Sequence, residues 1–114
     1  MDNRLNDALA FANYRLTLQV QRQNIEARVA AAKILSFQNA IFTATQDLIG
    51  YVGLLTVRGD TILVNDNSGN VIEILNPSDF LTLLIQTYNS AMKLKQEEQQ
   101  RLKSARSTAK IVGL

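Results

Sequence analysis

The chain of 114 residues contains no cysteine and no histidine. Without cysteine there can be no disulfide and no thiol nucleophile, and without histidine the commonest general base is missing. Zinc sites of the usual Cys/His kind are excluded for the same reason. We therefore expect no bound metal and no cofactor, and we expect that the protein is not an enzyme.

Aromatic residues and prolines are also scarce, with four Phe, three Tyr, no Trp and one Pro. A hydrophobic content of 46% over 114 residues is nevertheless enough for one folded domain. Because the apolar residues are mostly Leu, Ile, Val and Ala, the core is expected to be rich in helix. No uncharged apolar run is long enough to span a bilayer, and no apolar segment typical of a signal peptide opens the chain. The sequence predicts a soluble protein with no membrane partner.

Residues 3–38 contain neither Gly nor Pro, and they predict one long helix. Apolar residues recur there at helical spacing, at Leu5, Leu9, Ala12, Leu16, Leu18, Ile25, Val29 and Ala32. Residues 14–21 alternate between apolar and polar, which is a strand pattern. Helix is favoured over strand because no turn residues bracket this alternation.

The next segment predicts a short strand followed by a short helix. Residues 41–44 are β-prone, and Thr45 with Asp47 is typical of a helix N-terminus. The helix would carry Leu48, Ile49, Val52 and Leu55 in spite of two glycines. An alternative continues the first long helix to residue 49 and makes residues 51–57 a strand.

Residues 61–64 and 71–74 are β-branched runs that predict a β-hairpin, since the six residues between them favour turns. The segment 66–70 also has oxygen ligands and a glycine, as calcium-binding loops do. A plain turn is favoured because the flanking helices and the bidentate Glu of such loops are missing.

A second long helix is predicted from Pro77, which a first helical turn tolerates, to about Ser107. Its apolar side fades at Lys95 and Glu98, so its first half should be buried while its second half projects or pairs with another chain. The expected fold class is α+β, mainly helical: a long N-terminal helix, a short strand and helix, a β-hairpin and a long C-terminal helix. The two long helices should pack together with the small sheet at one end. We expect a compact domain of residues 1–98 and a basic arm of residues 99–114.

The arm is the part of the chain in which we expect contact with a partner. From residue 99 onward it carries four basic residues and no acidic one, and it ends in an apolar tail. The candidate docking residues are Arg101, Lys103, Arg106, Lys110, Ile111, Val112 and Leu114. Its cations could neutralise phosphates, but no aromatic residue is interleaved with them to stack on bases. A protein partner is therefore favoured over nucleic acid.

Four carboxylates, Asp60, Asp66, Glu73 and Asp79, come close together in the sequence and could in principle perform acid–base chemistry. They lie in predicted turns, on a strand and at a helix start, where acidic residues have structural roles. No base, nucleophile or oxyanion donor accompanies them. A structural role is favoured for all four.

Three segments carry a resemblance: LNDALAFANYRLTL (residues 5–18), the hairpin LVNDNSGNVIEI (residues 63–74), and the helix that ends in LKSARS (residues 102–107). Together they resemble small structural and accessory proteins of T4-like, contractile-tail bacteriophages. The hairpin and helix are also similar in pattern to a domain of tail-fibre-associated proteins. The resemblance covers most of the chain and rests on order and patterning.

The resemblance implies a tail- or baseplate-associated virion component, or an assembly factor, in the virion or the host cytoplasm. Such a protein acts by contacts with other protein subunits, including copies of itself. Two alternatives stay open. One is a phage nucleic-acid or transcription accessory protein that binds through the basic helix. The other is a prefoldin-like holdase, in which two long helices around a hairpin form a clamp.

Overall fold

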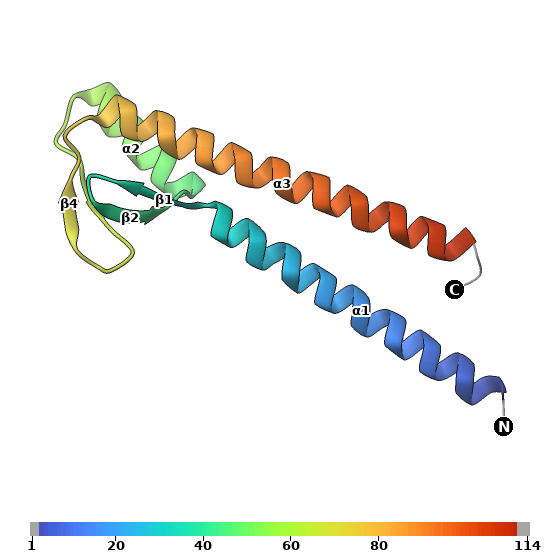
Figure 1. Cartoon of the computed structure of the whole chain (residues 1–114). Coiled ribbons are helices and arrows are strands. Elements are labelled where there is room, and N and C mark those ends of the chain that lie inside the picture. The colour runs from blue at the N-terminus through green and yellow to red at the C-terminus, as the bar shows by residue number, and fades with distance from the viewer. Residues whose placement is uncertain (1–2, 112–114) are drawn as a thin grey trace. The chain divides into compact units, whose positions relative to one another are not determined.

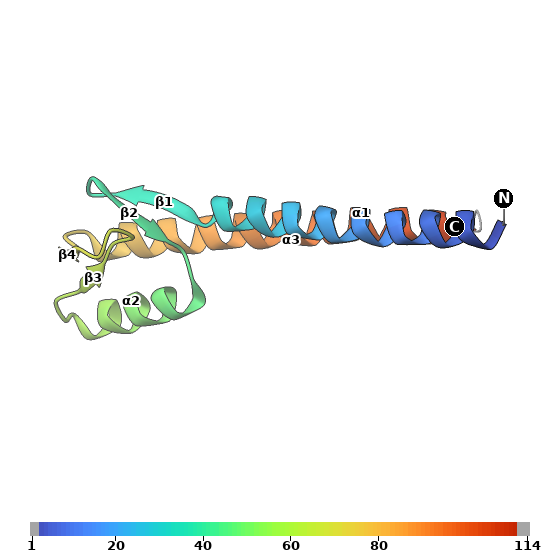
Figure 2. The same ribbon diagram turned by 90° about the horizontal axis from the view of Figure 1, so that it is seen from below.

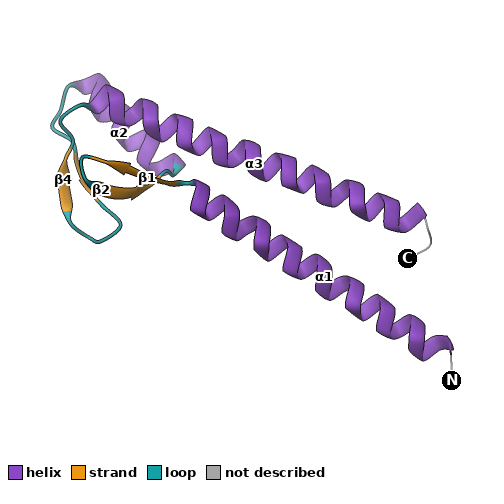
Figure 3. Ribbon diagram, viewed as in Figure 1, coloured by secondary structure: helices purple, strands orange, loops and turns teal. Residues whose placement is uncertain are grey.

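A computed structural model describes residues 3–111 and the side chains of residues 4–105. In chain order the elements are α1 (Asn3–Ala32), β1 (Ile34–Phe37), β2 (Ala40–Thr43), α2 (Gln46–Arg58), β3 (Leu63–Asn65), β4 (Val71–Glu73) and α3 (Pro77–Ile111) (Figure 1, Figure 3). This order confirms the predicted α+β, mainly helical class. In the described part of the chain, no helix is both long enough and apolar enough to cross a membrane.

The chain divides into two compact units. The hairpin unit comprises Val29–Leu94, and it contains all four strands, α2 and the first part of α3. The helical-pair unit comprises the described residues up to Arg28 and from Lys95 onward, so it consists of segments of α1 and α3. The predicted division between residues 1–98 and an arm of residues 99–114 stays a prediction.

α1 is helical throughout residues 14–21, so the choice of helix over strand is confirmed there. The prediction that this helix continues to residue 38 is wrong, because α1 ends at Ala32 and Ile34–Phe37 form β1. Residues 34–37 form a strand and not a helical turn because the strand buries one of their side chains. β1 places Leu35 in the core of the hairpin unit, whereas its neighbours Ile34 and Ser36 are exposed.

The short strand predicted at residues 41–44 is confirmed as β2, but its partner β1 was not predicted. The two strands pair antiparallel in a first hairpin, with Ile34 opposite Thr43 and Phe37 opposite Ala40. Its two-residue turn has positive φ at both positions, 50° at Gln38 and 61° at Asn39, as a type I′ turn requires. Neither residue is glycine, so the turn is strained. The Gln38 side chain offsets this strain with two hydrogen bonds: Nε2 donates to the Glu73 carbonyl at 2.9 Å, and Oε1 accepts from the Leu75 amide at 2.8 Å.

α2 begins as predicted. The Thr45 hydroxyl oxygen accepts a hydrogen bond from the Leu48 amide at 3.1 Å, and Asp47 lies in the first turn. The helix ends at Arg58 and is capped by Gly59, which has a φ of 75° and donates its N–H to the carbonyl groups of Leu55 and Thr56. The alternative of a strand over residues 51–57 is therefore wrong.

The second hairpin confirms the prediction for this region, with β3 antiparallel to β4 and Leu63 opposite Glu73. Asp66 closes its turn, because Oδ1 accepts hydrogen bonds from the amides of Ser68 and Asn70 at 2.9 and 2.8 Å. The Asn67 amide donates to the Ile41 carbonyl at 2.8 Å and so ties this turn to the first hairpin.

The core of the hairpin unit forms where the first turns of α3 lie between the first hairpin and α2 (Figure 2). Phe80 is completely buried, and its ring centroid lies 4.9 Å from that of Phe37 and 5.0 Å from that of Phe42. On the other side, α2 approaches α3 closely at Gly53, where a Cβ would stand 3.9 Å from Leu81 Cδ1. The remaining buried core residues are Leu35, Ala40, Ala44, Val52, Ile62, Val64, Ile74 and Leu84. The first part of α3 is thus a core element.

Phe80→Ala should lower the free energy of unfolding by about 3–5 kcal/mol, because it leaves a cavity between Phe37 and Phe42. Urea unfolding followed by circular dichroism measures the loss. Val57→Ala is the control: Val57 is 88% exposed, so its truncation should change stability by no more than about 0.5 kcal/mol. Equal losses from the two variants would contradict the assigned core.

Replacement by alanine should change the stability in opposite directions at two glycines, one inside α2 and one that caps its C-terminal end. Gly50 lies inside the helix with no atom near an added Cβ, so Gly50→Ala should stabilise by about 0.5–1 kcal/mol. Gly59 has positive φ, so Gly59→Ala should destabilise by about 1 kcal/mol or more. Thermal unfolding of both variants checks the pair, and a shift of the same sign for both would refute this account of the helix end.

Candidate interaction surface

The two segments of the helical-pair unit run antiparallel (Figure 1). Arg28 of α1 contacts Glu98 of α3, and Gln21 lines the same hollow as Ala105. The earlier residue of α1 thus lies near the later residue of α3, as the antiparallel direction of the two helices requires. Between these points, Ile25 is only 7% exposed and Leu102 is half-buried, so the two residues form the apolar part of the seam.

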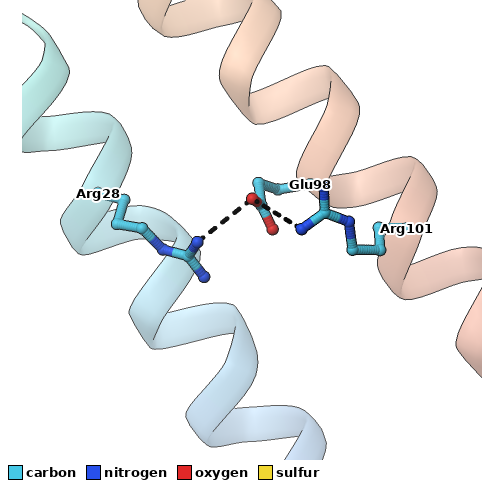
Figure 4. A network of polar contacts seen from close by, with 3 residues as sticks. All are labelled: Arg28, Glu98 and Arg101. Atoms are coloured by element: carbon cyan, nitrogen blue, oxygen red, sulfur yellow. Dashed lines mark hydrogen bonds and ion pairs between the residues drawn. The ribbon is translucent and has the colours of Figure 1, made fainter.

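A carboxylate occupies the centre of this seam (Figure 4). Glu98 Oε1 lies 3.2 Å from Arg28 Nη1 and 3.4 Å from Arg101 Nη1. The Glu98 side chain is 10% exposed, whereas those of Arg28 and Arg101 are 56% and 76% exposed. A carboxylate removed from water in this way needs cationic partners, and both arginines supply them from the rim. Glu98 does fall on the apolar side of α3, as the sequence predicts, and the two arginines explain how it is tolerated there.

α1 carries a second apolar side, which we call the outer stripe: Leu5, Leu9, Ala12, Leu16 and Val20. Its four larger side chains are between 45% and 60% exposed. Residues two apart on a helix point in nearly opposite directions, so Leu16 faces away from Leu18 and from the seam residue Ile25 beyond it. The helix is therefore apolar on two opposite sides, and the helical-pair unit covers only one of them.

Hollows flank the helical pair along both edges. On one edge, a hollow of about 310 Å³ is lined by Gln21, Asn24, Ile25, Arg28, Glu98, Arg101, Leu102 and Ala105. On the other edge, a hollow of about 420 Å³ is lined by both helices, and a neighbouring hollow of about 820 Å³ is lined by α1 alone. The two hollows share Arg22, and we call the surface that they cover together the cationic groove. Its lining residues are Phe11, Ala12, Tyr14, Arg15, Leu16, Leu18, Gln19, Arg22, Ile25, Glu26, Lys95, Gln99, Leu102 and Lys103.

Charge distinguishes the two edges. In the smaller hollow, both arginines already contact Glu98. The cationic groove instead has four basic residues, Arg15, Arg22, Lys95 and Lys103, and a single acidic residue, Glu26. The groove is therefore a surface with an apolar floor and a positively charged rim.

The predicted docking residues are distributed unevenly over this surface. Lys103 lines the cationic groove, while Arg101 is held by Glu98 on the other edge. Arg106, Lys110 and Ile111 lie in α3, but the structure describes only their backbone. Val112 and Leu114 lie outside the described residues altogether.

Sequence reasoning missed Arg15, Arg22 and Lys95 as members of the surface. The signal that could have found Arg15 and Arg22 is their helical spacing of seven along one edge of α1.

Two of the four carboxylates considered for catalysis, Asp60 and Asp66, have structural contacts. Asp60 Oδ2 lies 2.8 Å from Arg58 Nε, and Asp66 closes the turn of the second hairpin. Among the side chains that the structure describes, no three acidic groups gather closely enough to hold a metal ion.

Comparison of the chain with protein-family models, with curated proteins and with solved structures found no significant match in any of the three.

Glu98→Leu should leave the free energy of unfolding unchanged or raise it by about 1–4 kcal/mol, since an apolar residue of similar size removes the desolvated charge. The matched control is Glu97→Leu, at an exposed neighbouring position, which should give no such gain. Replacing Arg28 and Arg101 together by Met should instead lower stability by about 1–3 kcal/mol, because Glu98 then stays buried without a partner. Chemical denaturation of the three variants tests this, and a loss in Glu98→Leu as large as in the double variant would contradict it.

Proposed function

We propose that this chain is a non-enzymatic structural or adaptor protein that acts by protein–protein contacts. The observation that supports this best is the outer stripe of α1. Exposed apolar side chains that line up on one element are typical of interaction sites. Leu5, Leu9, Ala12 and Leu16 recur at i, i+4, i+7 and i+11, which is the spacing by which one helix is recognised by a groove or by another helix.

The resemblance to contractile-tail phage proteins suggests the assembly in which the chain would have this role. We propose a tail- or baseplate-associated component of a virion, or a factor for its assembly in the host cytoplasm. Its partners would be other subunits of that assembly, including further copies of the chain. The outer stripe suits such a role because it offers a contact area on a regular helix.

A prefoldin-like holdase is the second candidate, and Phe11 favours it. This ring is 60% exposed next to the outer stripe, so the same part of α1 offers apolar groups in more than one direction. A holdase binds many unfolded clients through such groups, whereas an adaptor binds one defined partner. The number of partners therefore separates the two functions.

Photo-crosslinking tests the proposal. A photoreactive phenylalanine analogue at Leu9, in the outer stripe, should give one discrete protein adduct when the full chain is irradiated in its native cells. The same analogue at the exposed Lys93, in the hairpin unit, is the control and should give no such adduct. Adding Leu5→Ser should remove the adduct formed from Leu9.

The other outcomes discriminate between the candidates. A broad smear of adducts would favour the holdase over the adaptor. An adduct that is removed by nuclease treatment would favour the nucleic-acid alternative. Absence of any adduct from Leu9 would reject the outer stripe as a contact surface.

A further inference from the structure

We propose that the cationic groove binds an acidic amphipathic helix from a partner protein. This inference rests on the proposed adaptor function and specifies the chemistry of the partner. It concerns one edge of the helical-pair unit, from Phe11 to Glu26 on α1 and from Lys95 to Lys103 on α3.

The floor of the groove fits the apolar side of a helix. Ile25 is buried, and Leu18 and Leu102 are half-buried, so aliphatic side chains form the base of the depression. From residue 11 to residue 26 the groove follows α1 for about 22 Å, the length of about four helical turns. A helix laid along it would contact α1 throughout and α3 beside Arg22, Ile25 and Glu26, where both helices line the groove.

The rim of the groove sets the charge of the occupant. Arg22, Lys95 and Lys103 have no ion-pair partner among the described side chains, and Glu26 is the only acidic residue of the lining. Positive rims attract and orient negatively charged partners. The opposite edge lacks this property because Glu98 already contacts Arg28 and Arg101. Charge complementarity therefore assigns an acidic helix to this edge.

A helix fits this surface better than a single-stranded nucleic acid does. Bases need open aromatic faces on which to stack. Here the Arg15 guanidinium lies over the Phe11 ring, 5.8 Å from its centroid, and Tyr14 is half-buried. The rest of the floor is aliphatic, and aliphatic side chains match the apolar residues of an amphipathic helix.

The probe is a synthetic helical peptide with Leu at i, i+3, i+4 and i+7 and Glu along both edges of that face. A matched peptide carries Lys at every Glu position. Fluorescence anisotropy with the full chain at low salt should show the Glu peptide binding at least about tenfold more tightly than the Lys peptide, and high salt should reduce the difference.

Charge-reversed variants locate the site. Lys103→Glu should weaken binding of the Glu peptide several-fold, whereas Lys93→Glu, the same change on the same helix outside the groove, should have little effect. The double variant Arg22→Glu/Lys103→Glu should reverse the preference, so that the Lys peptide becomes the tighter ligand. Far-UV circular dichroism of each variant verifies that its helix content is unchanged.

Equal binding of the two peptides, or a double variant that keeps the original preference, would overturn the proposal. So would a labelled single-stranded oligonucleotide that binds more tightly than the Glu peptide and displaces it. The groove shares Ala12 and Leu16 with the outer stripe, but Leu9 and Leu5 lie outside its lining, so the crosslinking and the peptide experiments test different residues. A lost peptide preference with a retained Leu9 adduct would reject only the acidic helix, whereas loss of the adduct would reject the adaptor function itself.

Discussion

A two-stranded hairpin is marginally stable in water, and residues 3–111 contain two of them. Each must therefore be held by something outside its own strands. Phe80 does this for the first hairpin, since its buried ring contacts Phe37 of β1 and Phe42 of β2. The first hairpin in turn holds the second, through the Gln38 side chain at the end of β4 and through the Ile41 carbonyl at the opposite turn. The fold of the hairpin unit thus depends on the first turns of α3.

This dependence explains which parts of the fold could be predicted. The second hairpin, the Thr45 cap and the start of α3 at Pro77 are specified by residues next to them in the sequence, so local reasoning found them. The first hairpin is different, because its turn is built from Gln38 and Asn39 and contains no glycine. Its positive φ values are stabilised by bonds to residues 73 and 75, which are distant in the sequence. The residues next to the turn in the sequence therefore give no indication of these hydrogen bonds.

The candidate site was predictable to a smaller extent for the same reason. The position of Glu98 on the apolar side of α3 follows from helical spacing, but its partner Arg28 lies 70 residues earlier in the chain. The basic residues of the arm drew attention to Arg101 and Lys103 together. Residues two apart on a helix point in nearly opposite directions, so Arg101 contacts Glu98 while Lys103 lines the groove with Arg22. That the two directions are separate edges of a helical pair follows only from the position of α1, which is distant in the sequence.

The contacts between the two helices of the helical-pair unit contribute little to stability, but they favour one alignment of the helices. Among the described side chains, Ile25, Leu102 and the buried carboxylate of Glu98 lie between hollows on both edges. A buried charge adds little net stability, yet it penalises any alignment of α1 and α3 that separates Glu98 from its arginines. The pair therefore holds a defined alignment while leaving apolar surface open at its edges and on the outer stripe. The exposed outer stripe is the surface on which the proposed adaptor function rests, and the unequal charge of the two edges is the reason why the proposed acidic helix is assigned to the cationic groove.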